Sequence, residues 1–479
     1  MSKEKFGDTE ITRRQIPTKL PPNERTSTFK EVDLGLTEGQ ALVEASRCLQ
    51  CTKMFCLAGC PASVRIPRFI NELKNKDYSK AIDIITETNS LPAITGRVCQ
   101  IEEQCEKACI LNKKGSPVAI GALERFVADR ALEGGLKQIK KGVPNGMKVA
   151  IIGSGPAGLT VAGDLVRLGY DVTVFEALHK PGGVLSYGIP DFRLPKEVVN
   201  SEVETLVNAG VNIATNVCVG QTLSIDNLFN MGFKAIFIGI GAGAPIMLNI
   251  PGHNLNSVYS ANEFLVRAVL MKAYRFPEYD TPIRVGKNVV VIGGGNTAVD
   301  SARVALRMGA ETITIVYRRC EKEMPARKEE VVRAKEEGVK IMPLVSPERF
   351  IGDEKNYVNG VECVRNQPTH IDASGRSYPA PIEGSNFLVE ADTVIIATGQ
   401  RANKLISQST PDLRIDSEGN VLVDYEARTS KSMVWAGGDI IGGSATVIQA
   451  IGAGKRAASS IHKALSTMNI KDGATPSTI

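Results

Sequence analysis

Seven of the ten cysteines in this 479-residue sequence lie close together, between Cys48 and Cys109. The first four follow one spacing pattern, and the other three follow a second: Cys48-x2-Cys51-x4-Cys56-x3-Cys60-Pro61, then Cys99-x5-Cys105-x3-Cys109. In a reducing compartment such a group of thiols binds metal more readily than it forms disulfides. The three remaining cysteines, Cys218, Cys320 and Cys363, are isolated.

Two kinds of metal site suit this pattern. A structural zinc site takes four ligands, usually as two close pairs. A four-cysteine run that ends in Cys-Pro is instead typical of two-cluster ferredoxins, where the last cysteine ligates the other cluster. We therefore expect two [4Fe–4S] clusters, with zinc or purely structural thiols as alternatives. The expected ligands are Cys48, Cys51 and Cys56 for the first cluster, and Cys60, Cys99, Cys105 and Cys109 for the second. The first cluster then lacks one ligand.

Helical patterns surround these cysteines. Apolar residues recur at helical spacing over 66–75, 78–88 and 117–132, and an N-cap candidate opens 37–47. A Gly- and Lys-rich stretch over 133–146 is typical of a linker. Residues 1–146 are therefore predicted to form a helical iron–sulfur domain.

A nucleotide-binding pattern begins directly after this linker. A strand leads into the turn Gly153-Ser-Gly155-Pro-Ala-Gly158, a helix over 159–168 and a second strand over 169–176 that ends in Glu176. This order makes the glycine motif a strong signal, although an α/β unit without a nucleotide is the alternative. The glycines let the backbone approach a pyrophosphate at the helix N-terminus, and Glu176 would bind ribose hydroxyls.

A second unit of this kind begins near residue 286. Its turn reads Gly293-Gly-Gly295-Asn296-Thr297-Ala298, with Ala298 in place of the third glycine. The next strand, over 312–317, ends in Arg318-Arg319. Two guanidinium groups there would pair with a 2′-phosphate, which favours NADPH over NADH, and Arg327 and Lys328 could add charge to the same pocket. A solvated strand end is the alternative.

A third signal lies near the C-terminus. A short strand ends in Gly438-Asp439 and is followed by a helix over 446–465; an Asp in this place can hold a flavin ribityl hydroxyl. Apolar strands over 235–241 and 393–399 end in glycine turns, as expected where a chain crosses between domains. We therefore expect an α/β fold with two nested Rossmann-like domains after the helical domain. The FAD-binding domain would comprise 147–250 and 401–479, and the NADPH-binding domain 251–400 would be inserted into it.

Composition excludes several other classes of protein. The formal net charge is only +5, and no dense Lys/Arg block predicts a nucleic-acid binder. The N-terminus has no apolar core of a secretory signal, and the longest apolar stretch, 235–248, is too short and glycine-rich to span a bilayer. A cytoplasmic protein without membrane contact is expected.

Longer motifs resemble a known family, the glutamate synthase small (beta) subunits. This family includes the large subunits of NADPH–ferredoxin oxidoreductases, which are electron-bifurcating transhydrogenases also called sulfide dehydrogenases, and the N-terminal half is also similar to dihydropyrimidine dehydrogenase. The motifs that carry the resemblance are Leu91-Pro-Ala-Ile-Thr-Gly-Arg-Val-Cys99, Ile120-Gly-Ala-Leu-Glu124-Arg-Phe, Gly182-Gly183-Val-Leu-Ser-Tyr-Gly-Ile-Pro190 with Phe192-Arg193, and Tyr259-Ser-Ala-Asn-Glu-Phe264.

The resemblance implies roles for further residues. Glu124 matches the position that supplies the missing ligand of the first cluster, and Gly183 and Arg193 match cofactor-binding positions. Two residues depart from the family pattern: Thr95 stands where some glutamate synthase small subunits have a Cys, and Gln100 stands where Pro is usual. The first departure favours the ferredoxin-linked branch.

The implied function is electron transfer among NADPH, FAD and the clusters, with no catalytic acid or base. The partner would be a second redox subunit, either a glutamate synthase large subunit or a ferredoxin-linked flavoprotein subunit, and ferredoxin itself is a further candidate. Three hypotheses stay open: a glutamate synthase electron-input subunit, the large subunit of an NADPH–ferredoxin oxidoreductase, and a non-catalytic redox-sensing module. Thioredoxin-reductase chemistry is disfavoured because neither nucleotide domain contains Cys-x-x-Cys.

Overall fold

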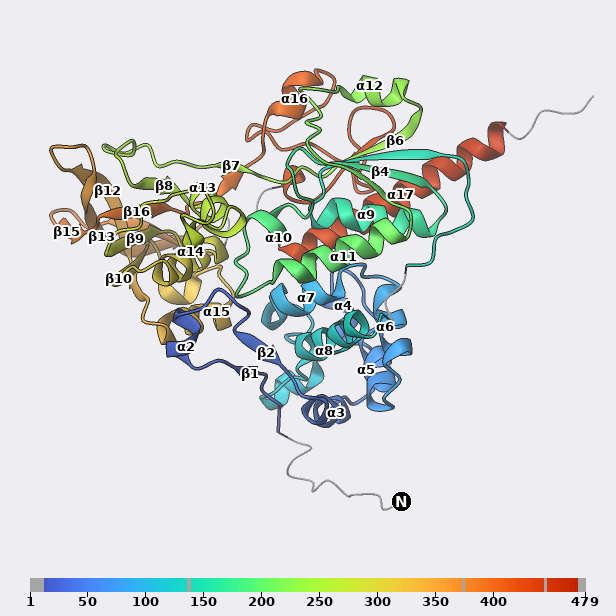
Figure 1. Ribbon diagram of the computed structural model, residues 1–479, viewed down its shortest axis with the longest axis horizontal. Coiled ribbons are helices and arrows are strands. Elements are labelled where there is room, and N and C mark those ends of the chain that lie inside the picture. Colours follow the sequence, from blue (N-terminus) through green and yellow to red (C-terminus); the bar gives the residue numbers. More distant parts are fainter. Residues whose placement is uncertain (1–12, 136–138, 373–374, 443–445, 473–479) are drawn as a thin grey trace, which may run out of the picture.

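The computed structural model describes residues 13–135, 139–372, 375–442 and 446–472. Helices that follow the N-terminal strands form one end of the molecule, and two separate parallel sheets lie beyond them (Figure 1). This arrangement confirms the predicted α/β class with a helical N-terminal domain. In this described part of the chain, no helix combines the length and apolar character needed to cross a bilayer.

The first sheet has five parallel strands in the order β18-β6-β3-β4-β5. Its central strands are apolar runs buried on both faces, as is typical of a parallel sheet covered by helices. The strands are β3 (Lys148–Ile152), β4 (Asp171–Phe175), β5 (Asn212–Ala214), β6 (Phe233–Ile238) and β18 (Val434–Ala436). The last strand thus returns to this sheet from almost 200 residues further along the chain.

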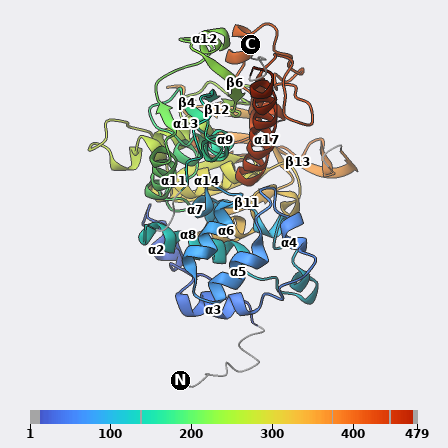
Figure 2. The same ribbon diagram turned by 90° about the vertical axis from the view of Figure 1, so that its right-hand side faces the viewer.

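Three helices pack near this sheet: α9 (Pro156–Arg167), α11 (Lys196–Asn208) and the long α17 (Val447–Asp472). Helix α17 lies along α9, as both ribbon views show (Figures 1 and 2). The contact is close, because a Cβ on Gly454 would meet the Ala157 carbonyl oxygen at 2.6 Å. The predicted helix over 446–465 is confirmed from Val447 onward, and α17 continues past residue 465 to Asp472.

The second sheet is also parallel, in the order β11-β10-β9-β16-β8. Its strands are β8 (Val258–Ser260), β9 (Asn288–Ile292), β10 (Thr312–Tyr317), β11 (Lys340–Pro343) and β16 (Thr393–Ile396), with α13 (Ala261–Leu265), α14 (Asn296–Arg307) and α15 (Lys328–Glu336) beside them. An antiparallel sheet adjoins it and was not predicted; it contains β12 (Val345–Gly352), β13 (Val358–Ile371), β14 (Ser377–Pro381) and β15 (Phe387–Glu390).

The two chain segments that join the parallel sheets lie side by side. Strand β7 (Ala244–Pro245) pairs antiparallel with β17 (Gln400–Arg401). Every strand between them, from β8 to β16, belongs to the second parallel sheet or to the antiparallel sheet. The limits of the domains at 250 and 400 stay predictions, and the pairing of these strands lies next to both limits.

The helical end carries α3 (Glu38–Ser46), α4 (Phe55–Ala58), α5 (Ile66–Lys74), α6 (Tyr78–Thr86), α7 (Pro92–Val98) and α8 (Ile120–Glu133). Thr37 caps α3 in a capping box with Gln40, as its sequence predicts. Helix α8 begins three residues later than predicted, because Pro117 and Val118 remain extended. Part of the predicted linker, 136–138, lies outside the described residues.

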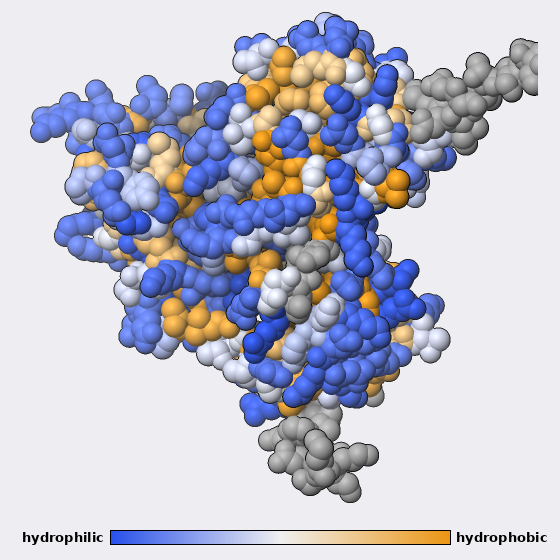
Figure 3. Space-filling view, turned by 45° about the vertical axis from the view of Figure 1, so that its right-hand side comes forward, coloured by the Kyte–Doolittle hydropathy of each residue, from blue (hydrophilic) through white to orange (hydrophobic). Residues whose placement is uncertain are grey.

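The helical domain shares one apolar core with the first sheet. Buried side chains of α5, α7 and α8 belong to the same cluster as those of α9 and α17, including Ile94, Leu123, Leu159 and Ile451. In the view of Figure 3, apolar residues gather in a hollow of the surface between these two parts, while much of the remaining face is polar. Because the core is continuous, the cysteine-bearing loops have a fixed position relative to the first sheet.

An N-terminal arm ties the helical domain to the second sheet. It contains β1 (Thr18–Lys19), α2 (Pro22–Thr26) and β2 (Asp33–Gly35). Val32 is buried in the core of the second sheet, and Arg333 of α15 forms an ion pair with Asp33 at 2.5 Å. This arm was not predicted, since its residues show neither helical nor alternating apolar spacing.

Candidate functional site

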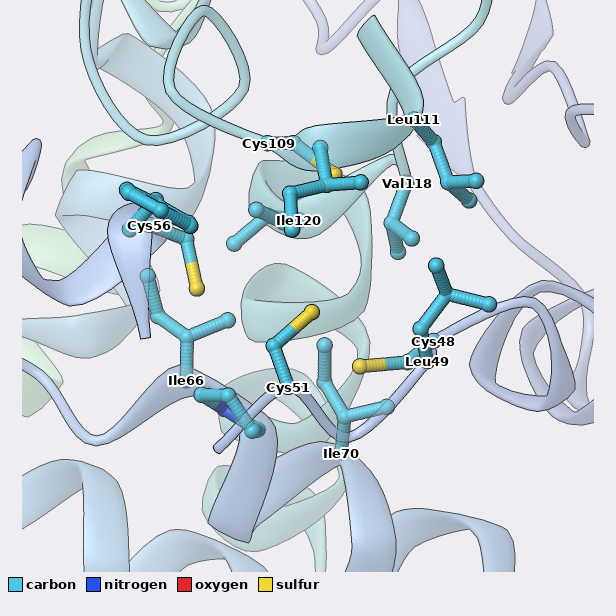
Figure 4. A pocket seen from close by; sticks show the side chains of 13 residues that line it. Cys48, Leu49, Cys51, Cys56, Ile66, Ile70, Cys109, Leu111, Val118 and Ile120 are labelled. Carbon is cyan, nitrogen blue, oxygen red and sulfur yellow. The ribbon is translucent and has the colours of Figure 1, made fainter. Parts of the chain in front are cut away.

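Four cysteines surround one apolar cavity in the helical domain, which we name the outer cavity. Its thiols belong to Cys48, Cys51, Cys56 and Cys109, and aliphatic side chains such as Ile66, Ile70 and Ile120 complete its walls. Figure 4 shows the four cysteine side chains arranged around this shared space. All ten cysteines of the chain are free thiols. The outer cavity therefore offers four potential ligands without help from any other residue type.

A second cavity, the inner cavity, lies next to the first. Its potential ligands are Cys60, Cys99, Cys105 and Glu124. Ile66 lines both cavities, so a single side chain forms part of the wall between them. Ile448, in the first turn of α17, also lines the inner cavity. The structure thus groups all eight predicted metal-binding residues into two sets of four.

The predicted division of these residues between two sites is wrong at two positions. Cys109 was expected beside Cys60 but lines the outer cavity, and Glu124 was expected beside Cys48 but lines the inner one. The reason lies at Gly59, where a Cβ would meet the Gln104 carbonyl oxygen at 2.8 Å. The turn that leads to Cys109 therefore packs against the loop that leads to Cys60. The two segments touch at this contact, and the last cysteine of each lines the cavity of the other group.

A sequence signal for this exchange existed. The rule that the last cysteine of a run ligates the other cluster applies to both runs, not only to the one that ends at Pro61. Applied to both, it places Cys60 with the second group and Cys109 with the first. Glu124 is then the fourth member of the second set.

Burial controls the protonation of these thiols. It raises the pKa of Cys48 and Cys60, raises that of Cys56 to about 11, and raises those of Cys99 and Cys105 well above the usual value. Such thiols are neutral near pH 7, so a metal would displace their protons on binding. Among the described residues, no three His, Cys, Asp or Glu side chains converge closely enough to hold a single metal ion.

Glu124 is the one carboxylate in the inner cavity. It is 9 % exposed, and burial raises its pKa to about 7, opposed by hydrogen bonds from Thr95 and Asn89. No role was predicted for Asn89, and Thr95 was identified only as a departure from the family pattern. These two residues are therefore site residues that sequence reasoning missed.

The first glycine turn brings its predicted residues together at the N-terminus of α9. Gly153 has φ +97°, and a Cβ on Gly158 would meet the Gly153 carbonyl oxygen at 2.0 Å. The turn is also reached by Gly183, whose Cβ would meet the Gly155 Cα at 2.9 Å, and by Gly438, whose Cβ would meet the Ala157 Cβ at 3.2 Å. A Cβ on Gly155 itself would point into open space.

Glu176 and Asp439 lie at the edges of this turn. The Glu176 carboxylate accepts a hydrogen bond from the Ser154 backbone N–H at 3.0 Å, and another from the Leu178 N–H at 2.9 Å. Asp439 follows Gly438 and begins a short 3-10 helix, and it is half-buried. Gly153 follows β3, Glu176 follows β4 and Asp439 lies shortly after β18, so these three residues are at the carboxyl ends of strands in the first sheet.

The second turn has the same build at the N-terminus of α14. Gly293 has φ +141°, and a Cβ on it would meet the Ala397 carbonyl oxygen at 2.3 Å. Gly295 is the N-cap, and its Cβ would again meet nothing within 4 Å. Asn296 and Thr297 form the first turn of the helix. The backbone of Gly295 is therefore open to a ligand at the helix N-terminus.

The two arginines after β10 differ in environment. Arg318 is exposed, whereas Arg319 is 5 % exposed and donates hydrogen bonds to the Asp372 carboxylate and the Ser377 carbonyl oxygen. The guanidinium of Arg319 is thus engaged by the antiparallel sheet. Only Arg318 of the predicted pair has a side chain that faces solvent.

Three other basic residues have partners that the sequence did not indicate. Arg193 lies between Asp300, at 2.6 Å, and Glu330, at 3.4 Å, in a buried ion-pair network. Arg327 donates to the Arg97 carbonyl oxygen at 3.0 Å, and Lys328 pairs with Glu103 at 2.8 Å. Both residues therefore contact the helical domain, and the charge that they would add to the nucleotide pocket stays a prediction. The role of Arg193 in cofactor binding stays a prediction.

Two protein families match successive parts of the chain. Residues 25–136 match the family described as dihydropyrimidine dehydrogenase domain II, 4Fe-4S cluster, and residues 147–454 match pyridine nucleotide-disulphide oxidoreductases. The chain is 36 % identical over 456 residues to the NADPH glutamate synthase small chain of Escherichia coli, covering 94 % of this chain and 96 % of that one. The chain belongs to the glutamate synthase small-chain family.

Other similarities agree with this family. The NADP(+)-dependent formate dehydrogenase subunit beta of Moorella thermoacetica is 36 % identical, over 86 % of this chain and 60 % of its own length. The solved structure of Mycobacterium tuberculosis FprA in complex with NADPH covers 70 % of this chain and 87 % of its own with a TM-score of 0.57, at 21 % identity, and shows the fold alone. This member of the family is an oxidoreductase that joins an iron–sulfur domain to a pyridine nucleotide oxidoreductase domain.

Proposed function

We propose that this glutamate synthase small-chain homologue moves electrons between NADPH and a partner protein through FAD and two [4Fe–4S] clusters. The observation that carries the proposal is the order of the two cavities. The inner cavity lies against the N-terminal turn of α17, and the outer cavity lies beyond Ile66, toward the surface. Two centres in series would connect the first sheet with the outside of the molecule.

The donors of each cavity fit one cluster. The outer cavity supplies the four thiols of Cys48, Cys51, Cys56 and Cys109; the inner one supplies Cys60, Cys99, Cys105 and the carboxylate of Glu124. A [4Fe–4S] cluster takes four protein ligands, normally thiolates, so both sets are complete. An oxygen ligand at the inner cluster would change its reduction potential relative to that of the outer cluster.

Both glycine turns fit a dinucleotide. Gly155 and Gly295 each leave the space at a helix N-terminus that a Cβ would fill, and backbone N–H groups there suit a pyrophosphate. We assign FAD to the turn of α9, where Gly183, Glu176 and Asp439 gather, and NADPH to the turn of α14, where Arg318 would pair with the 2′-phosphate. Bound FAD would accept two electrons from NADPH and release them singly, a task no side chain can perform.

The path from the flavin site to the inner cavity is short along the chain. Gly438 and Asp439 precede α17, whose second residue, Ile448, lines the inner cavity. Further along α17, Gly452 packs against the loop after Cys60, because a Cβ on Gly452 would meet the Pro61 carbonyl oxygen at 2.8 Å. This close packing supports the inner cavity as the one that exchanges electrons with the flavin.

The outer cavity lies beneath the surface that a partner would contact. Leu49 and Phe55 line this cavity and remain 58 % and 41 % exposed. The Lys53 ammonium lies 5.3 Å from the centre of the Phe55 ring. We assign this face to the second redox subunit. A glutamate synthase large subunit is the first candidate, and a ferredoxin-linked flavoprotein subunit, favoured by Thr95, is the second.

Anaerobic purification tests the proposal. The holoprotein should contain about eight iron atoms per chain by the ligand count, together with one FAD, and should reduce an artificial acceptor with NADPH. Stoichiometric zinc, or about four iron atoms, would overturn the two-cluster assignment. The chain that co-purifies with this protein would decide between the two partners. Absence of turnover with any acceptor would leave only a cofactor-binding module.

A further inference from the structure

One oxygen of the Glu124 carboxylate accepts both of the hydrogen bonds that this carboxylate receives. The Thr95 hydroxyl donates to Oε1 at 2.6 Å, and the Asn89 side-chain amide donates to the same oxygen at 2.9 Å. Among the described residues, no donor reaches Oε2. The carboxylate is therefore held asymmetrically, with one oxygen saturated and the other left for a different partner.

The donor pair is itself ordered. The Asn89 amide also donates to the Thr95 hydroxyl oxygen, at 2.8 Å, so this hydroxyl can direct its single hydrogen at the carboxylate. A hydrogen bond to a charged acceptor is stronger than the alternative from Thr95 to the Leu91 carbonyl oxygen at 3.1 Å. Asn89 in turn accepts from the Leu91 backbone N–H at 3.1 Å, which fixes its orientation.

Close helix packing fixes the distance between donors and acceptor. Thr95 lies on α7 and Glu124 on α8, and these helices touch at Gly96, where a Cβ would meet the Arg125 Cα at 2.7 Å. Arg97 reinforces the same pair of helices through an ion pair with Asp129 at 2.6 Å. The backbone of residue 95 therefore has a fixed distance from that of Glu124.

In the part of the chain that the structure describes, no cation pairs with the buried carboxylate of Glu124. The neighbouring Arg125 turns to Glu31, Asp33 and Asp129 instead, at 3.0–3.2 Å. Burial of an ionised carboxylate that has two neutral donors and no counter-ion costs free energy, unless a positive group contacts its free oxygen. The three thiols that face Glu124 across the inner cavity, those of Cys60, Cys99 and Cys105, supply no positive charge of their own.

We propose that Thr95 and Asn89 are positioning residues for an iron ligand: they hold Oε1 of Glu124 and leave Oε2 to bind the iron of the inner cluster. The inference rests on the proposed function, in which the inner cavity holds a [4Fe–4S] cluster. Thr95 then sets the orientation of the carboxylate, and through it the electronic environment of one iron.

The test compares variants of Thr95 in the anaerobic holoprotein. Thr95→Val removes the hydroxyl at constant volume, Thr95→Ser keeps it, and Thr86→Val is the matched control, since the Thr86 hydroxyl is buried and donates only to the Ile82 and Asp83 carbonyl oxygens. The measurements are the electron paramagnetic resonance spectrum and midpoint potential of each cluster. Thr95→Val should shift the signal and potential of the inner cluster but not those of the outer one, and Thr95→Ser should restore both.

An unchanged inner cluster in Thr95→Val would overturn the inference, and so would an equal shift in Thr86→Val. If Thr95→Val fails to assemble, Thr95→Ala removes the same hydroxyl without adding volume and is read in the same way. Glu124→Ala separates the two levels of the argument. If it leaves a normal inner cluster, Glu124 is not a ligand and the positioning role falls, while two intact clusters would still support the proposed function.

Discussion

At the scale of single residues, the exchange of Cys60 and Cys109 decides which side chain belongs to which centre. Both residues end a cysteine run, and both cross to the other cavity where the 104–108 turn packs on Gly59. Sequence spacing alone groups cysteines by proximity along the chain, which keeps Cys109 with Cys105. Packing of two loops against each other is a tertiary property that this spacing does not encode.

Paired cysteine variants test this assignment. Cys109→Ser should perturb the outer cluster and leave the spectrum of the inner one intact, whereas Cys60→Ser should do the reverse, because each thiol lines one cavity. Iron content and electron paramagnetic resonance spectra of the reduced protein measure both effects. Cys363→Ser, in the antiparallel sheet far along the chain, is the control. If Cys109→Ser changed the inner cluster instead, the grouping by cavity would be refuted.

The two arginines after β10 give a second prediction at this scale. Arg318→Ala should raise the KM for NADPH at least about tenfold and leave that for NADH unchanged, since a charge-assisted hydrogen bond contributes about 1.5–3 kcal/mol. Arg319→Ala should lower the melting temperature instead, because Arg319 is buried against Asp372 and Ser377. Steady-state kinetics with both nucleotides and thermal unfolding measure the difference. Equal effects of Arg318→Ala on both nucleotides would place the 2′-phosphate elsewhere.

At the scale of elements, buried ion pairs join α14 and α15 to the loop that carries Arg193. Glu330 of α15 is 1 % exposed and faces Arg193, Arg303 and Arg333. Burial opposes its ionisation, but these arginines hold the pKa of Glu330 well below its usual value. The network thus connects the loop before α11, between β4 and β5 of the first sheet, with two helices beside the second sheet.

Removing this carboxylate should destabilise the fold. Glu330→Ala should lower the free energy of unfolding by about 3–5 kcal/mol, because it leaves buried guanidinium groups without a partner. The control is Lys335→Ala on the same helix, whose side chain is 46 % exposed, whose partner Glu321 is also exposed, and whose effect should stay below about 1 kcal/mol. Denaturant unfolding measures both. Similar losses in the two variants would show that the buried network adds no specific stability.

The same network predicts a dependence of stability on pH. Because the folded-state pKa of Glu330 lies below the unfolded value of about 4.3, its contribution is present above that value and is lost as the pH falls toward the folded pKa. The free energy of unfolding should therefore fall more steeply below pH ~4.3 in the wild type than in Glu330→Ala. Parallel curves for the two proteins would contradict this origin.

Sequence reasoning succeeded best where an element has a strong local signal. The glycine turns at Gly153 and Gly293 and the capped helix after Thr37 appear where predicted, and so do the helices around the cysteines, except that α8 begins three residues late. It failed for the antiparallel sheet and the N-terminal arm, whose stability comes from distant partners such as Arg333 for Asp33. Likewise, Arg319 and Arg327 carry charges whose partners lie in other parts of the fold, so their surroundings could not be inferred from position in the sequence.

At the scale of the whole molecule, the helical domain contacts both sheet domains. It shares a core with the first sheet, and it meets the second through the N-terminal arm and through residues at the start of α15. Arg327 connects three parts here: its backbone N–H donates to the Asn296 side chain at 2.9 Å, and its guanidinium donates to the Arg97 carbonyl oxygen just before Cys99. The nucleotide turn of α14 and the inner cavity are therefore joined by one residue.

This joint gives a prediction about domain contact. Arg327→Ala should increase hydrogen exchange at backbone amides of 97–105 in the holoprotein, because the loop loses a buried partner. Lys328→Ala should have little effect, since the Lys328 side chain is 73 % exposed and its ion pair with Glu103 is screened by solvent. Hydrogen–deuterium exchange followed by mass spectrometry compares the two variants. Unchanged exchange at 97–105 in Arg327→Ala would show that the shared core alone fixes this loop.

The proposed serial order of flavin, inner cluster and outer cluster predicts that the two ends of the molecule can be separated functionally. Cys51→Ser removes a ligand from the outer cavity, which shares only Ile66 with the inner one. NADPH oxidation with a dye that takes electrons directly from flavin should stay near the wild-type rate, whereas electron delivery to the protein partner that co-purifies with this chain should be lost. The proposed order of the centres is the reason, since the exposed Leu49 and Phe55 line the outer cavity and not the inner one. Stopped-flow absorbance with each acceptor measures the two rates. If Cys51→Ser slowed both reactions equally, or if partner reduction survived the loss of the outer cluster, electrons would leave by another route and the serial order would be wrong.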